Sequence, residues 1–276
     1  MRYEKIYLKE YFPILGEAGR DPTLALYLPY NMPEMNRQDQ KRPCILLCPG
    51  GGYARCSQRE DEPIALHFLP EGFNVFVLTY SVAPNRFPAQ LREVAAAMEL
   101  IYANADSWNC DTDHIAIMGF SAGGHLAAHY STCFDCAEVR EAFPESKAVN
   151  ASILCYPVIT ADPAHSHKGS FKNLTGLDEI TEEAIEKFSC DRNVSEHTPP
   201  AFIWHTASDA TVPVMNSLLY AGALAKYKIP TELHIYPYGK HGLSTVDSQT
   251  NKELDEKTIH AAQWLPALKN WLKVIF

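Results

Sequence analysis

Three polar residues, Ser121, Asp209 and His241, have the types and surroundings that nucleophilic catalysis requires. Ser121 lies in Gly119-Phe120-Ser121-Ala122-Gly123, between an apolar run and the start of a helical pattern. A Gly-x-Ser-x-Gly pattern between a strand and a helix is typical of a sharp turn that exposes a serine hydroxyl, although so short a pattern also arises by chance. The small residues on either side of the serine let neighbouring backbone pass close to such a turn. We therefore consider Ser121 a candidate nucleophile.

A serine hydroxyl attacks a carbonyl at neutral pH only if an imidazole takes its proton and a carboxylate orients that imidazole. Asp209 follows a predicted strand over 201–205, and His241 follows the next one, over 232–236. Asp162 and Asp247 remain alternative acids, although Asp162 follows an earlier strand and Asp247 comes after the histidine. With His241 as the base, we expect activity to fall as the imidazole becomes protonated at acid pH.

A glycine-rich segment, Pro49-Gly50-Gly51-Gly52-Tyr53, follows the apolar run 44–48. Glycines at the end of a buried strand leave backbone N–H groups free to point at a ligand oxygen, whereas the simpler alternative is a flexible loop. The N–H groups of Gly51, Gly52 and Ala122 are therefore candidates for stabilising the oxyanion of a tetrahedral intermediate.

Apolar runs alternate with helical patterns along most of the chain. We predict strands over residues 3–9, 24–28, 44–48, 74–80, 115–118, 152–156, 201–205 and 232–236, and helices over 64–69, 91–102, 122–130, 179–188, 214–227 and 259–272. This alternation indicates a mostly parallel, twisted α/β sheet with helices on both faces and, without internal repeats, a single domain over 1–276. The polar segment 158–200 interrupts the order and is predicted to be a small lid insertion.

The overall composition excludes several classes of partner. A net charge of −9 over 276 residues argues against nucleic acid and anionic membranes. No apolar stretch approaches the roughly 20 residues that span a bilayer, and the N-terminus lacks a signal-like segment, so we expect a cytoplasmic protein. Of the eight cysteines, five that stand singly are expected to be small buried residues: Cys44, Cys48, Cys110, Cys155 and Cys190. Cys133 and Cys136 form a C-x-x-C pair, but no second pair lies at zinc-ligand spacing, so we expect no metal or redox role there. We expect no metal and no cofactor.

Together these motifs resemble the carboxylesterase/lipase branch of the α/β-hydrolase superfamily, and in particular acetyl-xylan-esterase-like enzymes. The resemblance covers residues 44–242, and its order of serine, aspartate and histidine is the order that α/β-hydrolases use. It departs from hormone-sensitive-lipase-like enzymes at Pro49, where they have a histidine. The residues that carry it are Pro49-Gly50-Gly51-Gly52-Tyr53, Tyr80-Ser81-Val82-Ala83-Pro84, Phe87-Pro88-Ala89, Gly119-Phe120-Ser121-Ala122-Gly123-Gly124-His125-Leu126, Trp204-His205-Thr206-Ala207-Ser208-Asp209 and His241-Gly242.

The resemblance implies an α/β-hydrolase fold and a cofactor-free serine esterase. Ser121 would be the nucleophile, His241 the base and Asp209 its orienting acid, with Gly51, Gly52 and Ala122 as the oxyanion hole. The substrate would be a small-molecule or oligosaccharide ester with a short acyl group such as acetyl, cleaved through an acyl-enzyme.

Two alternatives stay open: a serine peptidase of the prolyl-oligopeptidase type and a non-catalytic ligand-binding member of the fold. Tyr53, Tyr80 and Phe120 are candidate substrate-binding residues, although aromatic residues at such places are more often packed in the core. The sequence does not indicate an oligomeric state.

Overall fold

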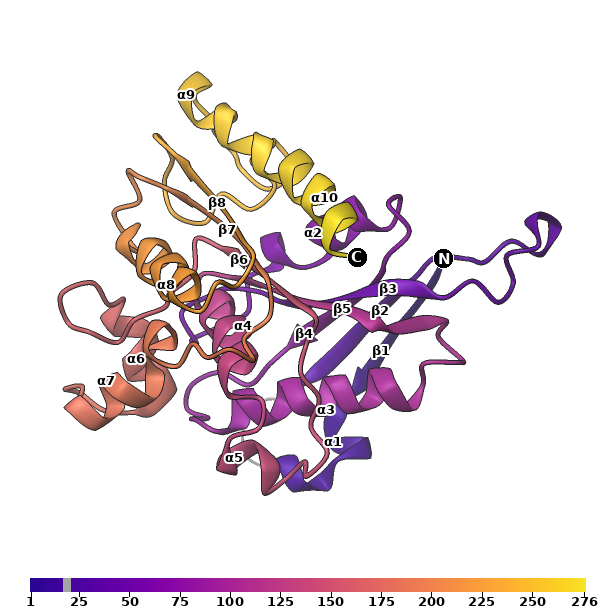
Figure 1. Cartoon of the computed structure of the whole chain (residues 1–276), viewed down its shortest axis with the longest axis horizontal. Helices are drawn as coiled ribbons and strands as arrows, with labels where there is room; N and C mark the ends of the chain where they lie inside the picture. Colours follow the sequence, from indigo (N-terminus) through magenta and orange to yellow (C-terminus); the bar gives the residue numbers. More distant parts are fainter. Residues whose placement is uncertain (17–20) are drawn as a thin grey trace.

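A single eight-stranded sheet forms the centre of the computed structural model, which describes residues 1–16 and 21–276 (Figure 1). The strand order is β1-β2-β4-β3-β5-β6-β7-β8. β2 pairs antiparallel with both β1 and β4. The remaining neighbours in this order, β4-β3-β5-β6-β7-β8, are all parallel to one another. The strands are β1 (Arg2–Tyr7), β2 (Thr23–Leu28), β3 (Arg42–Cys48), β4 (Asn74–Thr79), β5 (Cys110–Phe120), β6 (Ala151–Cys155), β7 (Ala201–Thr206) and β8 (Thr231–Tyr236).

Helices cover both faces of this sheet. The α-helices are α1 (Leu8–Tyr11), α2 (Glu62–Phe68), α3 (Ala89–Ala103), α4 (Ala122–Cys133), α5 (Ala137–Arg140), α6 (Lys168–Thr175), α7 (Glu182–Phe188), α8 (Met215–Lys226), α9 (Glu256–Ile259) and α10 (Trp264–Ile275). Short 3-10 helices are η1 (Pro13–Leu15), η2 (Pro33–Met35), η3 (Gln58–Glu60), η4 (Cys190–Arg192) and η5 (His260–Gln263). In Figure 1, α2 and α10 lie on one side of the sheet, and α3, α4 and α8 lie on the other.

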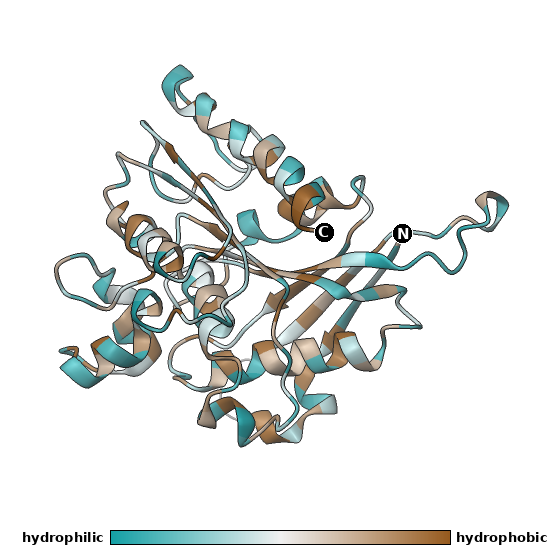
Figure 2. Ribbon diagram, in the orientation of Figure 1, coloured by the Kyte–Doolittle hydropathy of each residue, from teal (hydrophilic) through white to brown (hydrophobic). Residues whose placement is uncertain are grey.

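Two apolar layers, one on each face, hold the helices to the sheet. Alternate residues of β3 point to opposite layers: Leu46 packs in the layer beneath α3 and α4, and Leu47 packs in the layer beneath α2 and α10. A strand buried on both faces needs apolar residues at every position, which explains the unbroken run from Cys44 to Cys48. Helices need only one apolar face, and Figure 2 shows hydrophobic and hydrophilic residues alternating along α3 and α10.

The predicted fold class is confirmed, because the mostly parallel sheet is covered by helices on both faces. The segment 158–200 carries α6 and α7, and its role as a lid remains a prediction. The sequence analysis did not predict α6, a short and largely polar helix. Its N-terminus is capped by the side chain of His167, which accepts a hydrogen bond from the backbone N–H of Ser170. Across residues 1–16 and 21–276, no helix has the length and apolarity needed to cross a membrane.

Candidate active site

Ser121 lies at the tight turn between β5 and α4. Its backbone has φ 53° and ψ −117°, a conformation that non-glycine residues rarely adopt. The flanking glycines allow this turn, because a Cβ at Gly119 would lie 2.1 Å from the carbonyl oxygen of Gly123. A Cβ at Gly123 would lie 2.1 Å from the carbonyl oxygen of Cys48 in β3. The small residues of the motif therefore let α4 start directly against the sheet.

The structure brings Ser121, His241 and Asp209 together from three loops at the carboxyl ends of the strands. The Ser121 hydroxyl donates to His241 Nε2 at 2.7 Å, and His241 Nδ1 donates to Asp209 Oδ2 at 2.6 Å. A carboxylate can only accept, so the proton of the neutral imidazole belongs on Nδ1 and leaves Nε2 as the acceptor. This is the tautomer in which a histidine can take a proton from a serine hydroxyl.

The Asp209 carboxylate is buried and surrounded by N–H donors. Its Oδ1 accepts from the backbone of Thr211 at 2.9 Å and of Val212 at 3.0 Å. Its Oδ2 lies 3.3 Å from His205 Nε2, in addition to the contact with His241. Burial alone raises the pKa of Asp209, but the hydrogen bonds from His205 and His241 outweigh burial and hold the pKa well below its usual range. The carboxylate therefore stays ionised beside His241.

The two alternative acids lie elsewhere. Asp162 accepts a hydrogen bond from the backbone of Ala164 at 2.9 Å and pairs with Arg192 at 3.7 Å. Asp247 accepts hydrogen bonds within its own loop, from Thr245 among others. Among the described residues, only Asp209 forms an ion pair with His241.

Two of the three candidate oxyanion donors, Gly51 and Gly52, line the same cavity as Ser121, and the third, Ala122, follows the serine directly. Gly51 and Gly52 have φ values of 130° and 66°, and Ala122 is the first residue of α4. Within the described chain, the N–H groups of these three residues donate no hydrogen bond to other protein groups. The N–H of Gly50 is different, because it donates to Glu60 Oε2 at 2.9 Å. The N–H of Ala122, unpaired among the described residues, lies at the N-terminus of α4, where the helix dipole favours a developing negative charge.

A cavity of about 330 Å³ opens at this point, and its walls include Gly51, Gly52, Ser121 and His241. In the described parts of the chain, no group of three or more His, Cys, Asp or Glu side chains is arranged to hold a metal ion.

The three aromatic residues that we considered for substrate binding lie in the core instead. Tyr53 is 1% exposed and donates its hydroxyl proton to His125 Nδ1 at 2.8 Å. Tyr80 is fully buried and donates to the carbonyl of Pro49 at 2.6 Å. Phe120 is also fully buried and none of the three lines the cavity. Tyr53 and Tyr80 pack in the apolar layer on one face of the sheet and Phe120 packs in the layer on the other, so we correct the suggestion that they contact substrate.

The cavity is also lined by two residues that the sequence analysis did not assign to the site, one at the N-terminus of α6 and one within it. His167 has its pKa lowered mainly by burial and also by the nearby His241. Asn173 donates from its side chain to the carbonyl of Gly52 at 2.8 Å and so ties α6 to the glycine loop. The polar composition of 158–200 gave no signal for either residue, because their positions depend on how the insertion folds back over the sheet.

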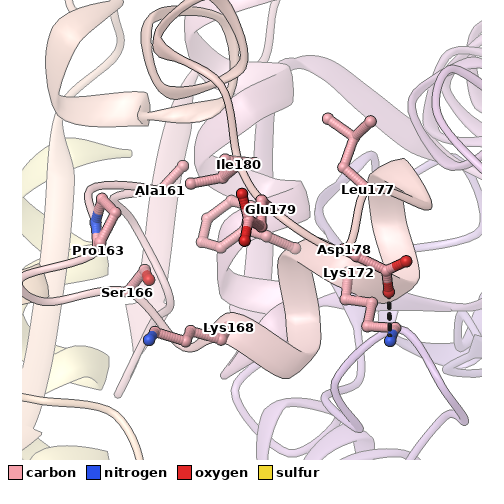
Figure 3. A pocket seen from close by; sticks show the side chains of 10 residues that line it. Ala161, Pro163, Ser166, Lys168, Lys172, Leu177, Asp178, Glu179 and Ile180 are labelled. Carbon is pink, nitrogen blue, oxygen red and sulfur yellow. Dashed lines mark ion pairs between the residues drawn. The ribbon is translucent and has the colours of Figure 1, made fainter.

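A second cavity, of about 220 Å³, lies along another face of α6 (Figure 3). Lys168, Phe171 and Lys172 contribute to its wall, whereas Gly169 and Asn173 of the same helix line the cavity at Ser121. The ion pair between Lys172 and Asp178, 2.7 Å long, crosses its rim (Figure 3). α6 therefore separates the two cavities.

The sheet order and the position of the serine turn define the protein as an α/β-hydrolase. More specifically, residues 26–224 match the family model BD-FAE, and the chain belongs to this family. Along 99% of its length it resembles the crystal structure of an acetyl ester-xyloside bifunctional hydrolase from Caldicellulosiruptor lactoaceticus. That likeness covers 96% of the other chain, with 34% identity and a TM-score of 0.85.

Two longer proteins are also similar to this chain. One is endo-1,4-beta-xylanase B of Butyrivibrio fibrisolvens, 37% identical over 89% of this chain and 38% of that protein. The other is an acetylxylan esterase of Xylanibacter ruminicola, 33% identical over 84% of this chain and 45% of that protein. The chain thus spans less than half the length of these two relatives.

Proposed function

We propose that the protein is a serine carboxylesterase that hydrolyses short-chain esters, with acetyl esters of carbohydrates as the first substrates to test. The observation that carries this proposal is the hydrogen-bonded series Ser121–His241–Asp209, beside a cavity that Gly51 and Gly52, whose N–H groups are unpaired within the described chain, also line. The names of two similar proteins, an acetylxylan esterase and an acetyl ester-xyloside hydrolase, support the choice of acyl group.

In the proposed mechanism, His241 Nε2 takes the proton of Ser121 as the serine oxygen attacks the ester carbonyl. Asp209 stabilises the imidazolium that forms, and the N–H groups of Gly51, Gly52 and Ala122 bind the oxyanion. The imidazolium then protonates the departing alcohol, which leaves an acyl group on Ser121. His241 activates water in the same way to release the acid.

We also propose that 158–200 acts as a lid, since its helix α6 lines the cavity.

The residues that line the cavity favour cleavage of an ester bond over cleavage of the glycosidic bond of a xyloside. Most glycosidases use a pair of carboxylates flanking the bond that they cleave. Glu60 is the one carboxylate among the described residues that line the cavity, and both of its oxygens accept hydrogen bonds from the protein. The peptidase alternative is tested by comparing the rates on an acetyl ester and on a peptide amide.

The proposal is tested with p-nitrophenyl acetate, an acetylated xylo-oligosaccharide and a fluorophosphonate probe. We expect the wild-type protein to release acetate from both substrates and to be labelled by the probe on Ser121. Ser121→Ala should lose the labelling and at least about a thousandfold in kcat/KM while keeping its melting temperature within a few degrees. Undiminished hydrolysis by Ser121→Ala would show that the reaction occurs elsewhere. An unlabelled, inactive wild-type protein would favour the ligand-binding alternative.

A further inference from the structure

Glu60 is a carboxylate buried beside the proposed nucleophile that the mechanism above does not use. It is the last residue of η3 and only 3% exposed. Its Oε2 accepts from the backbone N–H of Gly50 at 2.9 Å. Gly50 in turn separates Glu60 from the serine, because a Cβ at Gly50 would lie 2.7 Å from Glu60 Oε2 and 3.1 Å from Ser121 Cβ. The carboxylate thus fixes the residue that precedes the candidate oxyanion donors.

The other carboxylate oxygen leads to the loop of His241. Glu60 Oε1 accepts from the hydroxyl of Tyr156 at 2.6 Å, and that hydroxyl accepts from the backbone N–H of Ser244 at 3.0 Å. The ring of Tyr156 packs edge-on against His241, with ring centroids 5.1 Å apart. One residue therefore reaches both loops that flank the serine.

Arg59, the residue before Glu60, holds the same histidine loop. Its guanidinium donates to the carbonyl of Gly242 at 2.9 Å, and its carbonyl accepts from the Ser244 hydroxyl. These contacts cross more than 180 positions in the chain. η3 is therefore the element on which the glycine loop and the histidine loop meet.

The directions of these hydrogen bonds favour a carboxylate at position 60. The backbone N–H groups of Gly50 and Ser244 can only donate. Because Ser244 donates to the Tyr156 hydroxyl, the hydroxyl proton is directed to Glu60. Both Glu60 oxygens must then accept, as an ionised carboxylate can. A glutamine has one acceptor oxygen and an NH2 group, so it can keep only one of the two hydrogen bonds.

We propose that Glu60 is a positioning residue that couples the glycine loop carrying the oxyanion donors to the loop carrying His241. This inference rests on the proposed function, because it assigns Glu60 a part in the same reaction. Glu60 acts by holding Gly50 on one side and, through Tyr156, Ser244 and His241 on the other. Its loss leaves the nucleophile in place but misaligns the groups that take its proton and bind the oxyanion.

The test compares Glu60→Gln, Tyr156→Phe and the double variant. Tyr156→Phe removes the hydroxyl but keeps the ring against His241. The number of competent sites is first titrated with the fluorophosphonate, and kcat and KM for p-nitrophenyl acetate are then measured per titrated site. We expect each single variant to lower kcat about tenfold or more with KM changed less than threefold. The double variant should be little worse than the poorer single variant, because both remove the same connection.

Glu93→Gln is the matched control. Glu93 is also a buried carboxylate, 1% exposed, and it accepts from the backbone N–H of Ser81 at 2.6 Å, but it does not line the cavity. We expect this variant to keep the wild-type kcat per titrated site even if its melting temperature falls. A general sensitivity to losing a buried carboxylate would instead lower kcat in both glutamate variants.

The outcomes separate this inference from the proposed function. If wild-type protein is active and Glu60→Gln keeps its kcat per titrated site while losing thermal stability, Glu60 is only structural and the inference is wrong. Additive losses in the double variant would overturn the coupling. If Glu60→Gln fails to fold, Tyr156→Phe decides alone by the same kcat criterion. Inactivity of the wild-type protein itself would reject the proposed function.

Discussion

At the scale of single residues, the acid of the candidate site is held more firmly than a triad alone would require. Asp209 accepts hydrogen bonds from two backbone N–H groups as well as from His241. His205 Nε2 adds a contact with Asp209 Oδ2 at 3.3 Å. His205 Nε2 also donates to the carbonyl of Val212 at 3.0 Å, and its Nδ1 accepts from the Ser217 hydroxyl at 2.7 Å. These two hydrogen bonds place the ring proton on Nε2, the nitrogen that faces both the Val212 carbonyl and Asp209.

Replacing Asp209 with asparagine should remove the charge while nearly keeping the shape. We expect kcat for p-nitrophenyl acetate to fall roughly a thousand- to ten-thousand-fold, because an amide no longer selects the His241 tautomer with its proton on Nδ1 or stabilises the imidazolium. Steady-state kinetics measures the loss, and Asp162→Asn serves as the control at the alternative acid. A larger loss in Asp162→Asn than in Asp209→Asn would reverse the assignment.

At the scale of elements, α4 depends on a glycine that cannot be replaced. A Cβ at Gly123 would lie 2.1 Å from the Cys48 carbonyl oxygen and 2.4 Å from that of Pro49, both of which are backbone atoms. We expect Gly123→Ala to lower the free energy of unfolding by at least about 2 kcal/mol, because α4 must move away from β3.

Gly222 in α8 gives the matched comparison, because a Cβ there meets nothing within 4 Å. Gly222→Ala should instead stabilise the protein by about 0.5–1 kcal/mol through its higher helix propensity. Urea denaturation of both variants measures the difference. Equal effects of the two substitutions would contradict this account of α4.

α6 is the second element whose position matters for the site. Asn173 connects it to the carbonyl of Gly52. We expect Asn173→Ala to lower kcat/KM roughly threefold to tenfold, since one hydrogen bond contributes about 1 kcal/mol to holding the glycine loop. Lys172→Ala, which changes the neighbouring residue on the wall of the other cavity, should leave kcat/KM within twofold. Kinetics on p-nitrophenyl acetate compares the two, and a loss confined to Lys172→Ala would contradict this role for Asn173.

At the scale of the whole molecule, buried histidines should make stability depend on pH. Burial lowers the pKa of His125 to about 4 and, together with the neighbouring His125, lowers the pKa of His129 to about 3. An unfolded chain takes up these protons near pH 6.5, before the folded protein does. The unfolded state therefore binds more protons in this window, and stability falls as the pH drops from about 6.5 toward 4.

The expected loss is about 2 kcal/mol per histidine by pH 5, from 1.5 pH units below 6.5 at 1.36 kcal/mol each. Urea unfolding at pH 7.5 and pH 5 measures it. His129→Phe keeps a ring against Phe87, with which His129 stacks, and should show a smaller loss between the two pH values. An unchanged pH dependence in this variant would show that other groups dominate.

The sequence by itself determined which segments along the chain form the buried strands, and it determined the local turn at Ser121. Burial on both faces demands continuous apolar runs, and a tight turn demands glycines, so both features leave a local pattern that can be read without the fold. The positions of Asp209 and His241 after successive strands were readable for the same reason, because parallel strands end at one edge of the sheet. Their catalytic roles, and the cytoplasmic location, remain predictions.

Only the tertiary structure decided which polar residues support the site. Glu60 and Tyr156 are 96 positions apart, and Asn173 and Gly52 are 121 apart, yet each pair shares a hydrogen bond. Such contacts leave no periodic pattern, because they depend on where the loops meet after the helices pack on the sheet. The same packing buries the side chains of Tyr53, Tyr80 and Phe120 in the core. Strand ends bring residues to one edge, but side-chain direction and loop path decide which of them face the cavity.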